Sequence, residues 1–144
     1  MKELTTTTIK KYLNQNELCV LSTASKTGKS QSAVMAYAFD PKTWAFYLFT
    51  EDHTRKFKNL QQNSKVSLVI GGFKDDPSLQ IDGTVKIVSG KSVSTVKKFI
   101  LSLHPEWKDY FTNPCNRFLK IKPAWLRYGD YSQGAPQIAQ ISDF

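Results

Sequence analysis

Residues 49–60 read FTEDHTRKFKNL, and they mark the point where an apolar strand gives way to a helix. The run 44–50 contains four aromatic side chains, which is typical of a strand. Phe57 and Leu60 are three positions apart, and Thr54 is a favoured N-cap residue. The segment therefore predicts a strand over 44–50 followed by a helix over 54–62.

The start of this helix carries two cations, Arg55 and Lys56. A helix N-terminus already bears about half a positive charge, so each cation there is unfavourable by roughly a few tenths of a kcal/mol. A bound anion would offset this, and backbone N–H groups, the Thr54 hydroxyl, a guanidinium and an ammonium together make a phosphate site. The alternative is a solvated helix start in which Glu51 and Asp52 neutralise the two cations.

The composition bounds the class of protein. The 144 residues fit a single domain over 1–144, and the formal net charge is +8. The cations are scattered, with no run longer than a pair such as Lys10-Lys11, so nucleic-acid binding is not expected. No run of 18 apolar residues occurs, so no transmembrane helix is expected. The polar N-terminus also lacks the hydrophobic region of a signal peptide.

Cysteine and histidine are scarce. Cys19 lies in an apolar run and Cys115 in a loop, without CxxC spacing, which predicts free thiols in a reducing cytoplasm. His53 and His104 are the only histidines, so no metal site is expected. No nucleophile–base pair can be named from such a composition, and catalytic residues stay unassigned.

The periodicity predicts a mainly β chain with peripheral helices. Helices are expected at 8–16, 54–62 and 92–103, with a helical turn over 105–111. Strands are expected at 18–24, 31–39, 44–50, 66–70, 79–88 and 118–121, with a last strand segment at 125–131. The tail 132–144 has no clear period and is expected to be loose or docked on a partner subunit.

The connections favour an antiparallel sheet. Short turns link the first three strands, which predicts a meander rather than a parallel, doubly wound fold. Six or seven strands with few helices favour a closed sheet, because a barrel removes exposed strand edges. Gly83 inside a strand indicates a bulge, a barrel corner or a close approach by a ligand, and Pro123 indicates an edge or a bend.

Four segments in this order carry a resemblance to one family. They are 18–37 with a turn at Gly28, the aromatic-Thr-x-x-x-Thr-Arg-Lys pattern at 49–56, the run 59–68, and IDGTV at 81–85 followed by IKPAWLRY at 121–128. Over about residues 16–131 the chain resembles the FMN-binding split barrels related to pyridoxamine 5′-phosphate oxidase. The resemblance implies a six- to seven-stranded antiparallel split β-barrel of Greek-key type. It also implies a homodimer with two flavins in clefts between the subunits.

The resemblance assigns roles to twelve residues. Thr54, Arg55 and Lys56 would hold the FMN phosphate, while Phe49 and Thr50 would line the ribityl chain and the ring. Four residues of the second strand would run beneath the isoalloxazine: Ala33, Val34, Met35 and Ala36. Three further residues would contact the ring, its edge or the partner subunit: Gln80, Trp125 and Arg127.

Two aromatic groups have two interpretations each. The aromatic residues of the strand 44–50 either stack on a flavin or pack into the core on both sides of the strand, and we favour the core for those that face inward. Trp107, Tyr110 and Phe111 either wall a substrate pocket or cover one end of the barrel.

Two departures separate the chain from the true oxidase. The stretch 125–131, WLRYGDY, lacks the His of the Arg-x-His arrangement that holds the substrate phosphate, and 31–35, QSAVM, lacks the usual Arg. We therefore expect an FMN-dependent oxidoreductase with an unknown small-molecule substrate, similar to the short, general-stress or uncharacterised branch of the family. The flavin would carry the redox chemistry.

Three alternatives stay open. The first is a non-catalytic flavin- or ligand-binding module, such as a stress-related carrier or sensor. The second is the same fold with a deazaflavin or a haem in place of FMN, haem being weakened by the shortage of histidines. The third is a basic nucleic-acid-binding barrel, which would need exposed aromatic side chains among the cations.

Overall fold

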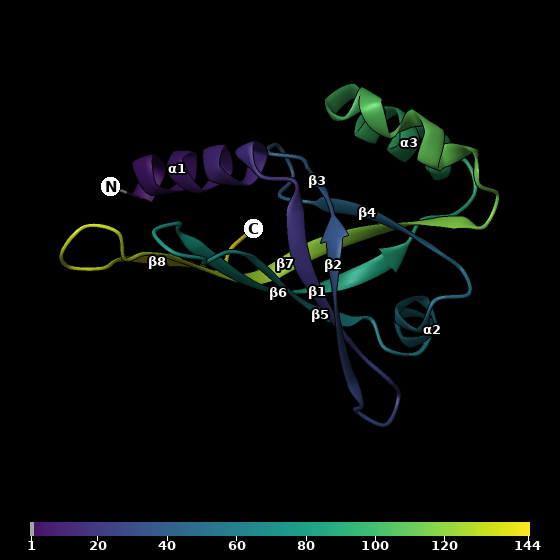
Figure 1. Cartoon of the computed structure of the whole chain (residues 1–144), viewed down its shortest axis with the longest axis horizontal. Coiled ribbons are helices and arrows are strands. Elements are labelled where there is room, and N and C mark those ends of the chain that lie inside the picture. The colour runs from purple at the N-terminus through teal and green to yellow at the C-terminus, as the bar shows by residue number, and fades with distance from the viewer. Residues whose placement is uncertain (1) are drawn as a thin grey trace.

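The computed structural model describes residues 2–144, with side chains from Thr5 onward, so Met1 of the predicted domain lies outside the described residues. The helices are α1 (Lys2–Gln15), α2 (Arg55–Gln62), α3 (Ser92–Leu103) and the 3-10 helix η1 (Pro105–Thr112). The strands are β1 (Leu18–Ala24), β2 (Ser30–Ala36), β3 (Ala38–Phe39), β4 (Phe46–Glu51), β5 (Lys65–Gly71), β6 (Ser78–Ile87), β7 (Asn116–Asp130) and β8 (Gln137–Ile141). Figure 1 shows a strongly twisted sheet with the helices around its margins.

The sheet is antiparallel and curled. Within the described residues its order is β2-β1-β5-β6-β7-β4-β3, with β8 beside β7. β2 and β3 lie at opposite ends of this order, yet only Tyr37 separates them in the chain. The chain thus links the two ends of the sheet, and this architecture confirms the predicted split β-barrel with peripheral helices.

The predicted strand 31–39 is divided at Tyr37 into β2 and β3. The three predicted strands therefore do not form one continuous meander. β2 pairs with β1, whereas β3 pairs with β4. The backbone N–H of Tyr37 donates to the carbonyl of Glu17, and its hydroxyl donates to the carbonyl of Leu13, both at 2.8 Å. These bonds hold Tyr37 against the end of α1, so the strand changes neighbours there.

The first helix is longer than the sequence predicted, since it begins at Lys2 rather than at residue 8. Its threonine-rich start has weak helix propensity, which hid it from local analysis. Packing supplies the stability instead. Ile9 and Leu13 are fully buried, and the Tyr12 hydroxyl donates to the carbonyl of Pro77 at 2.8 Å.

The C-terminal tail, which was expected to be loose or docked on a partner subunit, contains a strand, β8. β8 pairs along residues 126–130 of β7, and Ala139 and Ile141 pack against the core. The Phe144 ring lies 5.3 Å from that of Trp44. The tail therefore docks on the chain's own sheet.

β7 is one strand of 15 residues rather than the two predicted segments. Its pairing with β6 shifts register between Asp82 and Gly83, and Pro123 lies opposite Gly83. Pro123 is tolerated because this edge of β7 has no neighbouring strand there. The pairing of β7 with β4 ends at Ile121, and its pairing with β8 begins at Leu126. A Cβ on Gly83 would lie 2.5 Å from the backbone oxygen of Lys122. Gly83 thus marks a bulge, which was one of the three predicted possibilities, and the group that approaches it closely is backbone.

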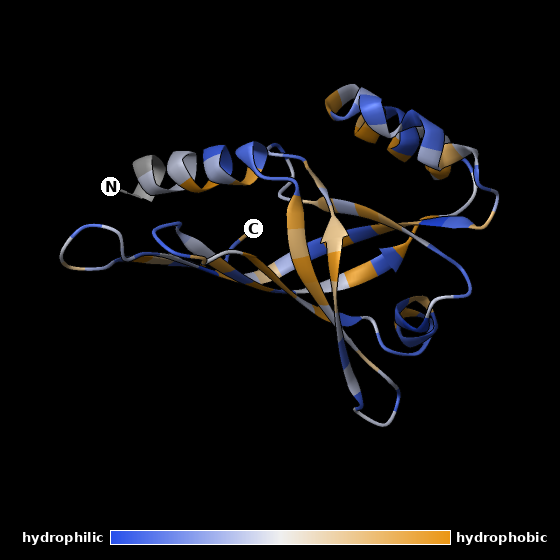
Figure 2. Cartoon of the chain, viewed as in Figure 1, coloured by the Kyte–Doolittle hydropathy of each residue, from blue (hydrophilic) through white to orange (hydrophobic). Residues whose placement is uncertain are grey.

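The core fills the curled sheet and continues beneath α3. Along β4 the side chains alternate, so that Phe46 and Leu48 are fully buried inside the sheet while Tyr47 and Phe49 pack against the cluster under α3 and η1. This supports the core interpretation of the aromatic strand, and Figure 2 shows the apolar residues concentrated on the central strands. Burial raises the pKa of the Cys19 thiol to about 12, which fits an inert core residue.

Candidate functional site

A cavity of about 660 Å³ opens beside the N-terminus of α2. Five residues that the resemblance assigns to the cofactor lie in its wall: Met35, Phe49, Thr50, Thr54 and Lys56. They come from β2, β4, the turn after β4 and the first turn of α2. The fold therefore brings together, in one chain, residues that are up to 21 positions apart in the sequence.

The cap of α2 fixes one end of this cavity. Thr54 has extended backbone angles, and its Oγ1 accepts from the N–H of Phe57 at 3.3 Å, as predicted for an N-cap. The same hydroxyl donates to the carbonyl of Glu51 at 2.9 Å. Since its one proton is used there, Thr50 is the donor in the 3.1 Å bond between the two threonine hydroxyls. In this structure the Thr54 hydroxyl shapes the turn, and its predicted contact with phosphate would compete with that bond.

The two cations at the helix start have no acidic partner in the part of the chain that the structure describes. Asp52 pairs with Arg117 at 2.9 Å, and Glu51 lies 3.1 Å from His53. The first turn of α2 contains no acidic residue. The neutralised arrangement that we considered from the sequence is thus not the one adopted. Lys56 lies in the cavity wall, whereas the neighbouring Arg55 is exposed and outside it.

α2 is held firmly against the sheet, so the helix start has a defined position. Phe57 and Leu60 are each 5% exposed and belong to the core. The buried Asn59 side chain donates to the hydroxyl of Thr23 at 3.1 Å, which ties the helix to β1. A helix anchored in this way keeps its N-terminal N–H groups aimed at one place.

Aromatic residues form the apolar side of the cavity. The Phe49 ring lies 4.9 Å from that of Phe111 and 6.0 Å from that of Trp107. Tyr110 lines the cavity, while Trp107 and Phe111 lie behind it in the cluster under α3. The group is thus divided between one residue that lines a cavity and two that belong to a hydrophobic cluster.

Five polar residues of the wall were not among the predicted site residues. Glu51 and His53 lie next to the α2 motif, whereas Asp109, Asn113 and Asn116 are distant from it in the sequence. Asp109 lies in η1, Asn113 follows the end of η1, and Asn116 begins β7, about 60 residues from the α2 motif. Asn116 is opposite Glu51 only because β4 pairs with β7. No local signal announces that pairing, so only a prediction of strand order would have found the distant residues.

The β2 residues divide between two faces. Met35 lines the cavity, and Ala33 shares its face because side chains alternate along a strand. Val34 is on the opposite face and is 69% exposed, and Ala36 shares that side of the strand. Within one chain the four residues therefore cannot all lie beneath a single ring.

Gln80, Trp125 and Arg127 do not line this cavity. Gln80 is directly opposite Arg127 across β6 and β7, and Arg127 donates to the Tyr131 hydroxyl at 3.2 Å. Trp125 donates to the Gln140 side chain at 3.4 Å. These three predicted residues form a second group, on a part of the sheet distinct from the start of α2.

Removing the cap should loosen α2. We expect Thr54→Ala to lower the free energy of unfolding by about 1 kcal/mol, because the N–H of Phe57 loses its acceptor. Thr54→Ser keeps the hydroxyl and should retain most of the stability. Urea denaturation followed by circular dichroism measures both, and equal stability of the two variants would contradict the capping role.

Comparison with known proteins places the fold in one family. A family model described as "Pyridoxamine 5′-phosphate oxidase" matches residues 5–129. A Clostridium acetobutylicum protein related to general stress protein 26 of B. subtilis is 16% identical, with TM-score 0.74 over 98% of this chain and 97% of that chain. A pyridoxamine 5′-phosphate oxidase-related, FMN-binding protein from Nostoc punctiforme is 10% identical, with TM-score 0.69 over 95% of each chain.

A heme-binding protein from Mycobacterium smegmatis has the same fold, with 15% identity and TM-score 0.68 over 86% of this chain. This chain spans 52% of that protein's length. No curated protein matches the sequence. No helix of the described residues has the length and hydropathy needed to cross a membrane. The family model covers most of the chain and the solved structures share its split barrel, so the chain belongs to the pyridoxamine 5′-phosphate oxidase family.

Proposed function

We propose that the chain binds FMN in the cavity beside α2 and acts as an FMN-dependent oxidoreductase. The observation that carries the proposal is the cationic start of α2, where Lys56 lies in the wall of a large cavity and Arg55 is next to it in the chain. Arg55 and Lys56 lack acidic partners within the described residues, and the cavity is about 660 Å³. That volume is in the usual range of cofactor sites, about 300–1,000 Å³. The FMN-binding relative supports the choice of ligand.

The wall suits the two ends of FMN. The helix N-terminus with Lys56 and Arg55 would hold the phosphate, and Phe49 with Met35 offers apolar surface for the ring. Bound FMN would supply hydride and electron transfer, which the side chains of the cavity cannot. The chain's own contribution is to bind, orient and exclude water from the cofactor.

The substrate of this activity is not pyridoxamine phosphate in our proposal. The stretch 125–131 offers no histidine for a second phosphate, and Arg127 is engaged with the Tyr131 hydroxyl.

We further propose that two chains pair through the outer face of the sheet. Register aligns Val34, Val20 and Val69 across β2, β1 and β5, and Gln80 and Arg127 continue the row. Val34 is 69% exposed and Val69 is 43% exposed, which is an unusual apolar row for a monomer. A partner on this face would cover the row and place Gln80 and Arg127 in the subunit interface.

The interface predicts a sensitivity to charge. Val34→Lys should convert the dimer to a monomer near 16.4 kDa, because a buried ammonium at the interface has no partner. Ser94→Lys adds the same charge on the exposed side of α3 and should leave the dimer intact. Light scattering after size exclusion measures the masses, and an unchanged mass for Val34→Lys would exclude this face.

The proposed function is tested by adding FMN to purified protein and following its absorption and fluorescence. We expect one FMN per chain and a visible flavin spectrum, followed by bleaching when a reduced nicotinamide is added. A protein that takes up no FMN would overturn the proposal. Binding without any turnover of a nicotinamide or an artificial acceptor would instead favour the non-catalytic module.

Haem is a second candidate for the same cavity, and one observation favours it. His53 lies in the cavity wall with 68% of its side chain exposed, which is suitable for an axial ligand. The relative from Mycobacterium smegmatis is a heme-binding protein. Hemin titration of the wild type and of His53→Ala tests this candidate. If His53 is the axial ligand, hemin should show a shifted Soret band with the wild type and no such shift with the variant. Competition between FMN and a deazaflavin for the purified protein shows which of the two binds more tightly.

A further inference from the structure

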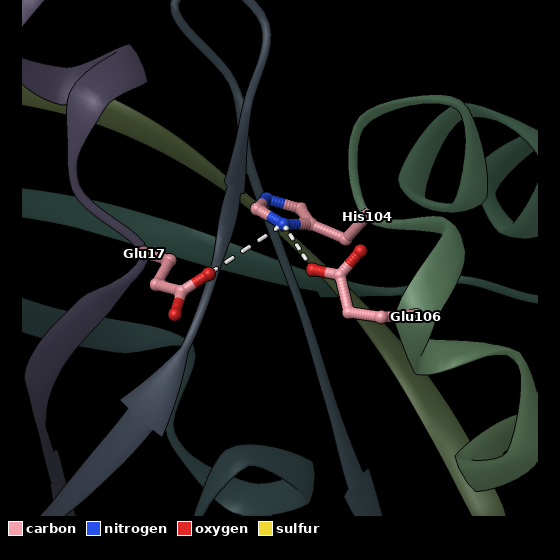
Figure 3. A group of neighbouring side chains, drawn as sticks. All are labelled: Glu17, His104 and Glu106. Atoms are coloured by element: carbon pink, nitrogen blue, oxygen red, sulfur yellow. Dashed lines mark hydrogen bonds and ion pairs between the residues drawn. The ribbon is translucent and has the colours of Figure 1, made fainter.

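Glu17, His104 and Glu106 meet outside the cofactor cavity, although the sequence separates them by almost 90 residues. Glu17 lies between α1 and β1, His104 lies between α3 and η1, and Glu106 lies in the first turn of η1. The Nδ1 atom of His104 is 3.3 Å from Oε1 of Glu106 and 3.7 Å from Oε2 of Glu17. Figure 3 shows both carboxylates directed at the same ring nitrogen.

The imidazole is held in place by its surroundings. Its ring stacks on that of Trp107, with centroids 3.9 Å apart and planes 8° apart. The backbone of His104 donates to the carbonyl of Ile100 and accepts from Trp107. Only 17% of the His104 side chain is exposed, whereas the two carboxylates are more than half exposed. The arrangement combines one fixed nitrogen with two oxygens that reach water.

We propose that Glu17, His104 and Glu106 form a binding site for a divalent transition-metal ion such as Zn²⁺. Donor atoms about 2.1 Å from a tetrahedral ion are roughly 3.4 Å from one another. The Nδ1-to-oxygen distances are close to this, and all three ligand atoms lie within 4.8 Å of one another. One imidazole with two carboxylates suits Zn²⁺, Mn²⁺ or Co²⁺ rather than Ca²⁺.

The surroundings favour a cation there. A hollow of about 310 Å³ borders Glu17 and His104 and gives water access to the open coordination positions. The C-terminus of α1 at Gln15 is two residues from Glu17, and a helix C-terminus carries about half a negative charge. A bound ion would join α1 to the segment between α3 and η1. The scarcity of histidines predicts no metal site, whereas in this proposal two carboxylates supply the ligands that histidines do not.

His53 is a natural control, because it also has two carboxylates nearby. Its Nε2 is 3.1 Å from Glu51, but the Asp52 carboxylate is 4.0 Å from the other nitrogen, Nδ1. The two carboxylates thus address opposite sides of the ring, and one ion cannot take all three ligands. Of these two histidine clusters among the described residues, the His104 cluster alone converges on a single point.

The first test is calorimetric titration of the full chain, freed of any affinity tag and dialysed against EDTA, with ZnCl₂. We expect one Zn²⁺ per chain, with His104→Asn binding at least tenfold more weakly and Glu17→Gln or Glu106→Gln also weakened about tenfold or more. His53→Asn should bind as the wild type does. The absence of binding at millimolar Zn²⁺, or equal binding by His104→Asn, would overturn the site.

The second test uses Trp107 as a reporter and does not depend on the folding of the His104 variant. Co²⁺ bound to the stacked imidazole should quench Trp107 fluorescence, and Trp107→Phe should lose this quenching while still binding Zn²⁺. Quenching that persists in Trp107→Phe would place the ion elsewhere. FMN plays no part in either test, so the site stands or falls independently of the proposed function.

Discussion

Replacing Arg55 and Lys56 together by alanine should weaken FMN binding more than tenfold. Hydrogen bonds to charged groups contribute about 1.5–3 kcal/mol each, and about 1.4 kcal/mol is a factor of ten in Kd. The residues stand at the start of α2, where the described structure gives them no acidic partner. Fluorescence titration of the wild type and the double variant gives the two dissociation constants.

Riboflavin makes this test specific for the phosphate. It has the same ring and ribityl chain as FMN but no phosphate, so its Kd should be nearly the same for the wild type and the double variant. Lys58→Ala removes an exposed cation of the same helix that does not line the cavity, and it should leave the affinity for FMN unchanged. Equal losses for riboflavin and FMN would show that the variant damages the cavity rather than the phosphate site.

The double variant also has a signature without ligand. Two cations at a helix N-terminus oppose the helix dipole, so their removal should leave the unliganded protein as stable as the wild type or slightly more stable. Lower affinity together with undiminished stability is the combination expected of residues kept for binding. A large drop in thermal stability without FMN would instead assign the two residues to the fold.

The motif at 49–60 was predictable from the sequence because everything it needs is local. The cap, the buried Phe57 and Leu60, and the cations all lie within one strand end and one short helix. α3 was predicted at its observed bounds for the same reason, since an apolar stripe repeats along a single helix. Features of this kind are set by near neighbours in the chain.

The errors concern residues whose neighbours are distant in sequence. Tyr37 looked like one more residue of a strand, but its bonds to Glu17 and Leu13 end the pairing of β2 there. β8 is stabilised by β7 and by core contacts that a weak local pattern does not show. Likewise Asn116 reaches the cavity only through the pairing of β4 with β7.

The candidate site follows the same division. Five of the predicted residues, Met35 among them, line one cavity, because the family pattern encodes the short segments that carry them, whereas Arg55 lies outside it. Gln80, Trp125 and Arg127 belong to one predicted site only if a second chain completes it. The sequence of one chain does not show where a partner lies, which is why these residues remain a proposal.

Gly83→Val should destabilise the protein by about 3 kcal/mol, the upper end of the usual effect of overpacking. A Cβ there would lie 2.5 Å from the backbone oxygen of Lys122 and 3.3 Å from a side-chain carbon of Ile121. The backbone oxygen cannot move aside as a flexible side chain would. The two strands must therefore separate or the bulge must shift, and urea denaturation should show a lower midpoint with an unchanged m-value.

Thr84→Val is the matched control, because it places the same side chain at the next position of β6, where the residue is exposed. It should change stability by less than about 0.5 kcal/mol. Equal stability of the two variants would mean that β6 and β7 do not approach so closely at the bulge. Gly83 is also absent from the cavity wall, so Gly83→Val should bind FMN normally at temperatures where it stays folded. The two variants thus test the contribution of the bulge to stability separately from the contribution of α2 to FMN binding.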